Sequence, residues 1–234
     1  MFFFIAQTEH AVSLPWYPER KVEVIYLGVE FQDYTNDELT AELIDMGLDG
    51  KQYFLFIGTL EPRKNIITII RAFELLIKTI GKGDISSLYL VIAGGLGWKN
   101  EDIIDAIQTS PVKNRIIYTG YVSQKRKVAL LKNAFCFVWP SLYEGFGLPI
   151  LEAMYFGIPV ITSDNSSLPE VGGDATLYVD PKNILEIKNA MREMLKNYEL
   201  REKMSEKGKE MAKNFTRQKT SQETLNFYQK FSYE

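Results

Sequence analysis

The sequence predicts an α/β domain of the Rossmann-like, doubly wound type, in which helices cover both faces of a parallel sheet. Two observations lead to this fold class. Short apolar runs alternate with helical patterns along most of the chain, and the runs are continuous, which is typical of strands buried on both faces. Because strands at this spacing join through right-handed βαβ units, the alternation favours one parallel sheet.

Six apolar runs are predicted to be strands, and each ends at a residue that breaks regular structure. They lie at Val22–Gly28, Tyr53–Gly58, Leu88–Gly95, Arg115–Gly120, Cys136–Ser141 and Ile158–Ser163. Helical patterns separate them at about Asp37–Met46, Asn65–Ile80, Asn100–Thr109, Ser123–Lys132 and Leu148–Phe156. Asn65 and Ser123 belong to the residue types that cap helix N-termini.

The two ends of the chain differ from this central pattern. Residues 1–20 fit no strand–helix unit, and we expect a leader or a remnant of a preceding domain there. Residues 21–215 are expected to form the Rossmann-like domain. A basic helical extension begins near residue 182, and residues 216–234 are expected to form a final helix that crosses to another domain.

Composition excludes several classes of protein. The chain has 234 residues, of which 46% are hydrophobic and 24% charged, with a net charge of −3. These values are ordinary for a soluble globular protein and make nucleic-acid binding a poor prospect. One cysteine, Cys136, and one histidine, His10, cannot build an internal disulfide or a cysteine- and histidine-rich metal site. The apolar start is too short to span a bilayer, so a cytoplasmic location is expected.

The most informative segment runs from Pro140 to Asp164. Gly145 and Gly147 lack a Cβ and let the backbone approach a ligand closely, and a helix that begins near Leu148 directs free N–H groups at the same place. This arrangement predicts a phosphate or diphosphate site. Glu144 and Glu152 flank it, and ionised carboxylates accept hydrogen bonds from the hydroxyls of a sugar or a ribose.

A second segment, Gly58–Asn65, follows a predicted strand and opens the next helix. Open α/β sheets bind ligands at the carboxyl ends of their strands. Arg63 and Lys64 stand there at a helix N-terminus, where the helix dipole disfavours cations, so a bound anion would explain them. Val91–Gly95 and Thr119–Ser123 form weaker corners of the same kind.

These blocks together resemble the C-terminal, nucleotide-sugar-binding half of retaining GT-B glycosyltransferases of the group 1, or family 4, type. The family's E-x7-E motif is matched by EGFGLPILE, from Glu144 to Glu152. Four further blocks follow the family's order, namely GTLEPRKN, GYVS, GIPVITSD and SSLPEVGGDATLYVDP. The resemblance covers about residues 20–232. GTLEPRKN and SSLPEV look most like mannosyltransferases of polysaccharide synthesis.

The resemblance implies a role for each matching residue. Arg63 and Lys64 would neutralise the donor diphosphate, Glu144 would hold a donor-sugar hydroxyl, and Glu152 would hold the ribose hydroxyls. The wider donor-binding set implied by the matching blocks is Gly58, Thr59, Tyr121, Val122, Gly145, Phe146, Gly147 and Leu148. Many members have arginine where Thr59 stands, so Arg63 is expected to do that arginine's work.

The function implied is transfer of a sugar from a nucleotide-diphosphate sugar, GDP-mannose or a UDP-sugar, to a glycan or lipid-linked acceptor with retention. No D-x-D pair occurs in the sequence, so Arg63, Lys64 and the helix N-terminus must meet the diphosphate charge, and we expect no metal and no cofactor.

Two alternatives stay open. A nucleotide-sugar epimerase of the same fold would lack the EGFGLPILE block. The chain could also be a non-catalytic nucleotide-sugar-binding module or one half of a split enzyme, because about 150 residues of the family's acceptor-binding domain are not present in it. Aromatic residues near both ends then favour contact with a partner chain carrying that domain or a homo-oligomer, which could also place the protein peripherally at a membrane.

Overall fold

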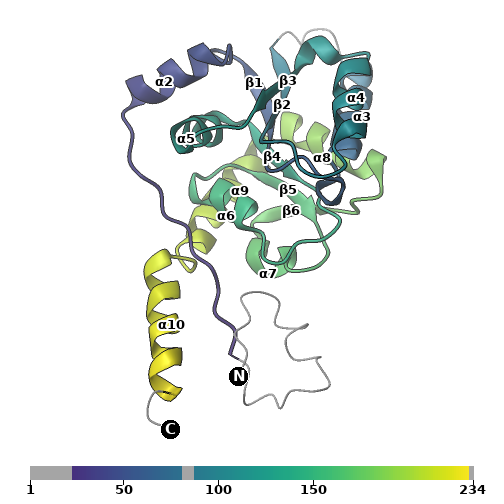
Figure 1. The fold of residues 1–234 in the computed structure, drawn as a ribbon. Helices are drawn as coiled ribbons and strands as arrows, with labels where there is room; N and C mark the ends of the chain where they lie inside the picture. Colours follow the sequence, from purple (N-terminus) through teal and green to yellow (C-terminus); the bar gives the residue numbers. More distant parts are fainter. Residues whose placement is uncertain (1–22, 81–86, 232–234) are drawn as a thin grey trace.

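The computed structural model describes residues 23–80 and 87–231, and Figure 1 shows a central sheet with helices on both of its faces. The strands are β1 (Gln52–Ile57), β2 (Leu88–Ala93), β3 (Ile116–Gly120), β4 (Cys136–Trp139), β5 (Val160–Ser163) and β6 (Thr176–Val179). All pairs are parallel, and the order across the sheet is β3-β2-β1-β4-β5-β6. The predicted doubly wound fold class is confirmed, and the strand order reverses between β1 and β4.

Helices connect the strands and extend beyond the last one. They are α2 (Asn36–Asp45), α3 (Ile66–Thr79), α4 (Glu101–Thr109), α5 (Gln124–Asn133), α6 (Leu148–Tyr155), α7 (Leu168–Gly172), α8 (Ile184–Lys196), α9 (Tyr198–Ala212) and α10 (Arg217–Phe231), with the short 3-10 helices η2 (Pro62–Lys64) and η3 (Lys113–Arg115). The five predicted helices are confirmed to within two residues at each end. Ser123 caps α5 as expected, since its hydroxyl accepts a hydrogen bond from the backbone N–H of Arg126.

The core is built where β1 and β4 pair. Phe56 on β1 stacks on Trp139 of β4 with ring centroids 4.8 Å apart, and Phe137 lies on the other side of the same indole at 5.8 Å. All three side chains are buried. This aromatic stack fixes β4 against β1 directly beneath the place where both strands end.

One predicted strand is wrong. Residues 23–28, the described part of the Val22–Gly28 run, form no strand but an extended segment that lies beside the start of α10 (Figure 1). The N–H of Val29 donates to the carbonyl of Phe215, and the hydroxyl of Thr220 donates to the carbonyl of Tyr26 at 2.7 Å. Ile25 is buried in this segment, and the ring of Tyr26 packs on Phe146 and Phe215, so these side chains are covered without the segment joining the sheet.

The C-terminal helix α10 matches the predicted final helix, and it extends away from the body of the domain in Figure 1. Phe227 on this helix is buried and Tyr228 is exposed. The leader at residues 1–20, which was expected to form an aromatic patch with α10, lies outside the described residues. No helix within the described ranges combines the length and apolar character that crossing a bilayer requires.

Candidate functional site

The predicted site residues come together at the carboxyl edge of the sheet, next to the point where the strand order reverses. The loop after β1 carries Arg63 and Lys64, and the loop after β4 carries Glu144. The N–H of Leu142 donates to the carbonyl of Arg63 at 2.9 Å, which joins the two loops. Neighbouring parallel strands thus bring residues about 80 positions apart into one cluster.

Glu144 lies at the centre of this cluster and binds both cations. Its Oε1 accepts from Nζ of Lys64 at 2.7 Å and from the hydroxyl of Ser141 at 2.7 Å. Its Oε2 accepts from Nη1 of Arg63 at 2.9 Å. The second guanidinium nitrogen, Nη2, donates to Glu61 at 2.6 Å. Two cations and two carboxylates therefore form a continuous network with balanced charge.

Serine hydroxyls fix the backbone of Glu144 as well as its carboxylate. Ser166, in the loop after β5, accepts from the N–H of Glu144 at 3.0 Å, and Ser167 donates to its carbonyl at 3.0 Å. Ser163 donates to the carbonyl of Ser141 at 2.6 Å. The loop after β5 therefore supports the loop after β4, and Glu144 is held at both its main chain and its side chain.

The environment of Lys64 lowers its pKa below the ordinary value. Burial of the ammonium group is the largest cause, and the hydrogen bond that it donates to Glu144 opposes it. Nζ also lies 4.6 Å from the centroid of the Trp139 ring. For Arg63, partial burial works against the charge, but Glu144 and Glu61 more than offset that effect and raise the pKa. The surroundings thus favour the charged form of Arg63 and disfavour that of Lys64.

The glycine loop leads into α6 as predicted. Gly147 has φ +106° at the start of the helix, a backbone conformation that residues with a Cβ rarely adopt. A Cβ on Gly145 would meet nothing within 4 Å, so that side of the loop is open to a ligand. Phe146 is buried instead, and its ring packs on Tyr26 and Phe215. Leu148 is partly buried at the helix start, so only backbone groups of Phe146–Leu148 are suited to meet a phosphate.

Glu152 lies on α6 and is separate from the Glu144 network. Its carboxylate pairs with Lys127 of α5, and both side chains are part-buried. The corner after β3 follows the edge strand of the sheet, two strands away from β1, and there the side chain of Tyr121 is 83% exposed while that of Val122 is buried. These positions agree with a role for the backbone of Tyr121 and Val122 and assign none to the tyrosine ring.

The remaining predicted residues, Gly58 and Thr59, line the first loop. A Cβ on Gly58 would lie 2.6 Å from Cη2 of Trp139, and a Cβ on Gly94 would lie 1.9 Å from the carbonyl oxygen of Gly58. Close packing of this loop explains the glycine at 58 without a ligand. Asn65, expected to cap α3, has a left-handed backbone with φ 59°, and its side chain makes no capping bond. Its amide donates instead to the carbonyls of Pro140 and Pro181.

Sequence reasoning missed several supporting residues. Ser141, Ser166 and Ser167 orient Glu144, Glu61 holds Arg63, and Lys127 pairs with Glu152. A usable signal was present for the serines, because they follow strands β4 and β5 and therefore had to lie at the ligand-binding edge. The carboxylate of Glu61 makes one further contact, because it accepts a hydrogen bond from Nε1 of Trp98 at 3.2 Å.

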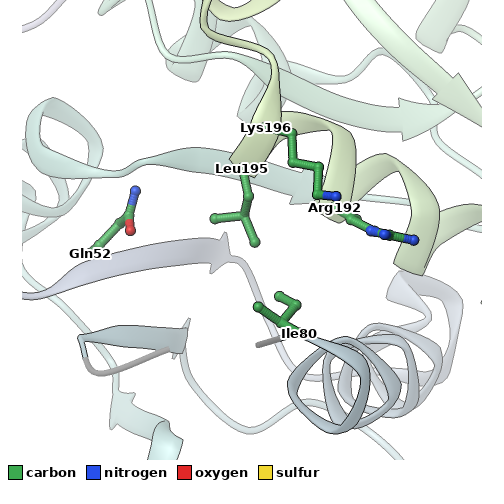
Figure 2. Close-up of a pocket in the computed structure, with 5 residues that line it drawn as sticks. All are labelled: Gln52, Ile80, Arg192, Leu195 and Lys196. Carbon is green, nitrogen blue, oxygen red and sulfur yellow. The ribbon is translucent and has the colours of Figure 1, made fainter. Parts of the chain in front are cut away.

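Outside the Glu144 network, the described residues form a cavity at the far edge of the sheet but no cluster suited to a metal ion. Within residues 23–80 and 87–231, no group of three or more His, Cys, Asp or Glu side chains is placed to hold a metal ion. Figure 2 shows a cavity of 350 Å³ lined by side chains from the start of β1, the end of α3 and the last turns of α8. Gln52 begins β1, so this cavity lies at the amino edge of the sheet, opposite the Glu144 network.

Structural comparison shows the same fold in known enzymes. The chain superposes on sucrose-phosphate synthase from Thermosynechococcus elongatus with a TM-score of 0.80, 21% identity, and coverage of 99% of this chain and 58% of that one. Anabaena HepE in complex with UDP and glucose gives a TM-score of 0.83, 15% identity, and coverage of 98% and 63%.

Sequence comparison identifies the family. Residues 45–211 match the family model described as glycosyl transferases group 1. The O-antigen chain mannosyltransferase B of Escherichia coli is 38% identical over 177 residues, which are 75% of this chain and 45% of that relative. The chain thus spans less than half of this relative's length. With the family match covering most of the strands and the Glu144 network, the chain belongs to the group 1 glycosyl transferases.

Proposed function

We propose that this chain binds a nucleoside-diphosphate sugar at the Glu144 network and supplies the donor half of a retaining glycosyl transfer. The observation that carries the proposal is the pairing of one buried carboxylate with two cations, beside an open glycine loop and a helix N-terminus. Cations and helix N–H groups suit a diphosphate, and a carboxylate among them suits a sugar hydroxyl.

Each member of the network has a distinct part in this proposal. Lys64 and Arg63 contact the diphosphate and stabilise the charge that develops on it as the sugar leaves. Glu144 then exchanges its cation partners for a hydroxyl of the donor sugar. The exchange replaces carboxylate–cation pairs by phosphate–cation pairs, so the buried cations keep compensating charge throughout.

Glu152 serves the ribose in the same proposal. Among the residues that the structure describes, its partner is a lysine from a different helix, and that ion pair is part-buried. Two ribose hydroxyls can replace the one ammonium group on the carboxylate, because an ionised carboxylate accepts several hydrogen bonds. The base then lies toward the backbone of Tyr121 and Val122.

The comparisons support a nucleotide-sugar donor and a hexose as the transferred group. The E. coli relative is a mannosyltransferase of O-antigen chains, and the structure of HepE is a complex with UDP and glucose. GDP-mannose and UDP-sugars are therefore the donors to test, with a glycan or a lipid-linked sugar as acceptor. Transfer is proposed to proceed with retention and without a metal or cofactor.

A second function to be tested is binding of the donor without transfer. The aligned segment covers 45% of the E. coli relative, so the activity of that whole protein is not carried over to this chain. In that case the chain is a nucleotide-sugar-binding module or one half of a split enzyme that needs a partner chain carrying the acceptor site. Assays of donor hydrolysis and sugar transfer by the purified chain alone separate the two functions.

Calorimetry with UDP, GDP, UMP and GMP tests the donor site itself. We expect one diphosphate to bind more tightly than its matching monophosphate, because Arg63 and Lys64 serve the second phosphate. Lys64→Ala should weaken diphosphate binding by about 1.5–3 kcal/mol, the range for a hydrogen bond to a charged group. Equal affinities for the mono- and diphosphates of both bases would overturn the proposal.

A further inference from the structure

Trp139 lies directly beneath the cation that we assign to the diphosphate. It is the last residue of β4 and is 1% exposed. Nζ of Lys64 lies 4.6 Å from the centroid of its ring, within the distance of a cation–π contact. Phe56 and Phe137 stack on the indole at interplanar angles of 15° and 16°, so the ring has little freedom to turn.

The loop that carries Lys64 is shaped around this indole. Gly58 opens the loop, and a Cβ there would lie 2.6 Å from Cη2 and 3.0 Å from Cζ3 of Trp139. The six-membered part of the ring therefore occupies the space that any other residue at 58 would need. The loop after β1 therefore packs closely on the indole, and the indole lies beneath Lys64.

Fold stability does not explain why this residue is a tryptophan. Its indole Nε1 is buried and has no hydrogen-bond partner among the residues that the structure describes. A buried N–H without a partner is costly, and each such group in a native protein calls for an explanation. Phenylalanine would keep an aromatic ring in the stack and remove that cost. Tryptophan, however, presents the aromatic face that attracts a cation most strongly.

We propose that Trp139 is a positioning residue for the donor diphosphate, because its indole face holds the Lys64 ammonium group at the cleft. The inference rests on the proposed function of Lys64. When Glu144 turns to the donor sugar, Lys64 loses its carboxylate partner, and its flexible four-carbon side chain could turn away. The fixed ring under Nζ keeps the ammonium group where the diphosphate arrives, so less ordering is required on binding.

Calorimetric binding of UDP and GDP to Trp139 variants tests this role. Trp139→Phe should weaken diphosphate binding by about threefold and Trp139→Leu by about tenfold, following the strength of the cation–π contact. Phe137→Leu is the matched control, since it removes a ring from the same stack and has no contact with Lys64. It should leave the affinity within twofold of the wild type, although it also loosens the core.

A double-mutant cycle distinguishes positioning from a general structural effect. In a Lys64→Met background, Trp139→Phe and Trp139→Leu should cost no further affinity, because their effect passes through the ammonium group. The same fold-loss in both backgrounds would overturn the inference. So would unchanged affinity of Trp139→Phe, which keeps the stack and remains informative if the leucine variant does not fold. Wild-type protein that binds neither diphosphate would instead refute the proposed function itself.

Discussion

The two glutamates of the E-x7-E motif stand in different surroundings although they are eight residues apart. Glu144 accepts hydrogen bonds from Lys64, Arg63 and Ser141, and its side chain is 8% exposed. Within the described ranges Glu152 pairs with Lys127 alone, and its side chain is 19% exposed. The carboxylate of Glu144 is buried, in a loop that hydrogen bonds join to the loops after β1 and β5, whereas the carboxylate of Glu152 lies on helix α6.

This difference separates two kinds of proposed ligand-binding residue. Removing one partner of a buried ion network leaves the other charges uncompensated in a region of low dielectric, which is strongly destabilising. Removing one partner of a more accessible pair costs little, because water takes its place. Glu144 is therefore part of the architecture as well as of the site, whereas Glu152 can be changed with effects confined to the ligand.

Glu144→Gln should produce the largest effect. The substitution leaves Lys64 and Arg63 facing each other without the shared carboxylate, and we expect a loss of about 3 kcal/mol in the free energy of unfolding. Urea denaturation of the purified chain measures it. Glu61→Gln is the control, since Glu61 binds Arg63 without contacting Lys64, and its cost should be smaller. A loss below about 1 kcal/mol for Glu144→Gln would place its carboxylate in the same class as Glu152.

The pH dependence of UDP binding sharpens the same contrast. Burial holds the pKa of Lys64 below its ordinary value of 10.5, so this group loses its proton in the folded protein before it would in the unfolded chain. Affinity for UDP should therefore fall as pH rises through that lowered pKa. The unfavourable effect of the buried charge of Lys64 on the free energy of unfolding should diminish over the same range, up to pH 10.5. Titration of UDP binding from neutral to alkaline pH measures the fall.

Lys64→Arg provides the comparison for that titration, because a guanidinium stays protonated across the range. Its binding curve should lack the alkaline fall, even if its affinity at neutral pH is lower. Identical pH profiles for the two proteins would show that another group governs binding. Glu144 and Arg63 face Lys64 in both proteins, so they are constant in the comparison.

Glu152→Gln should produce the smallest change in stability, within about 1 kcal/mol of the wild type, since it breaks one part-buried ion pair. Its main effect should be on ligand affinity. Affinity for UDP should fall, because the ribose loses its acceptor, whereas affinity for pyrophosphate, which has no ribose, should not change. Calorimetry with both ligands tests the distinction. Equal losses for UDP and pyrophosphate would contradict the ribose role.

Most of the sheet could be predicted from the sequence, and the one wrong strand shows where such prediction fails. A continuous apolar run indicates burial, and five runs were buried as strands between helices. The run ending at Gly28 is buried differently, because Phe215 and the start of α10 supply its hydrogen-bond partners. Contacts with residues almost 190 positions away decide which element covers this apolar run. The local sequence pattern does not predict such contacts.

That the residues of the candidate site would meet could be predicted, but their pairings could not. Glycines, cations and carboxylates that follow parallel strands had to lie at one edge of the sheet. Nothing in the sequence says that Glu144 binds both cations or that Lys127 reaches Glu152 from a separate helix. Side-chain partners depend on the relative height and twist of loops, which only the folded backbone determines.

The side chain of Asn65 has a consequence for how the cluster forms during folding. Its amide joins the end of η2 to the carbonyl of Pro140, 75 residues away, and to that of Pro181, 116 residues away. Contacts of such sequence separation close only after most of the chain has collapsed. The cluster at the carboxyl edge of the sheet therefore cannot fold before the rest of the sheet. Amides around η2 should exchange with solvent only through opening events close to global unfolding, while the exposed corner at Tyr121 exchanges freely.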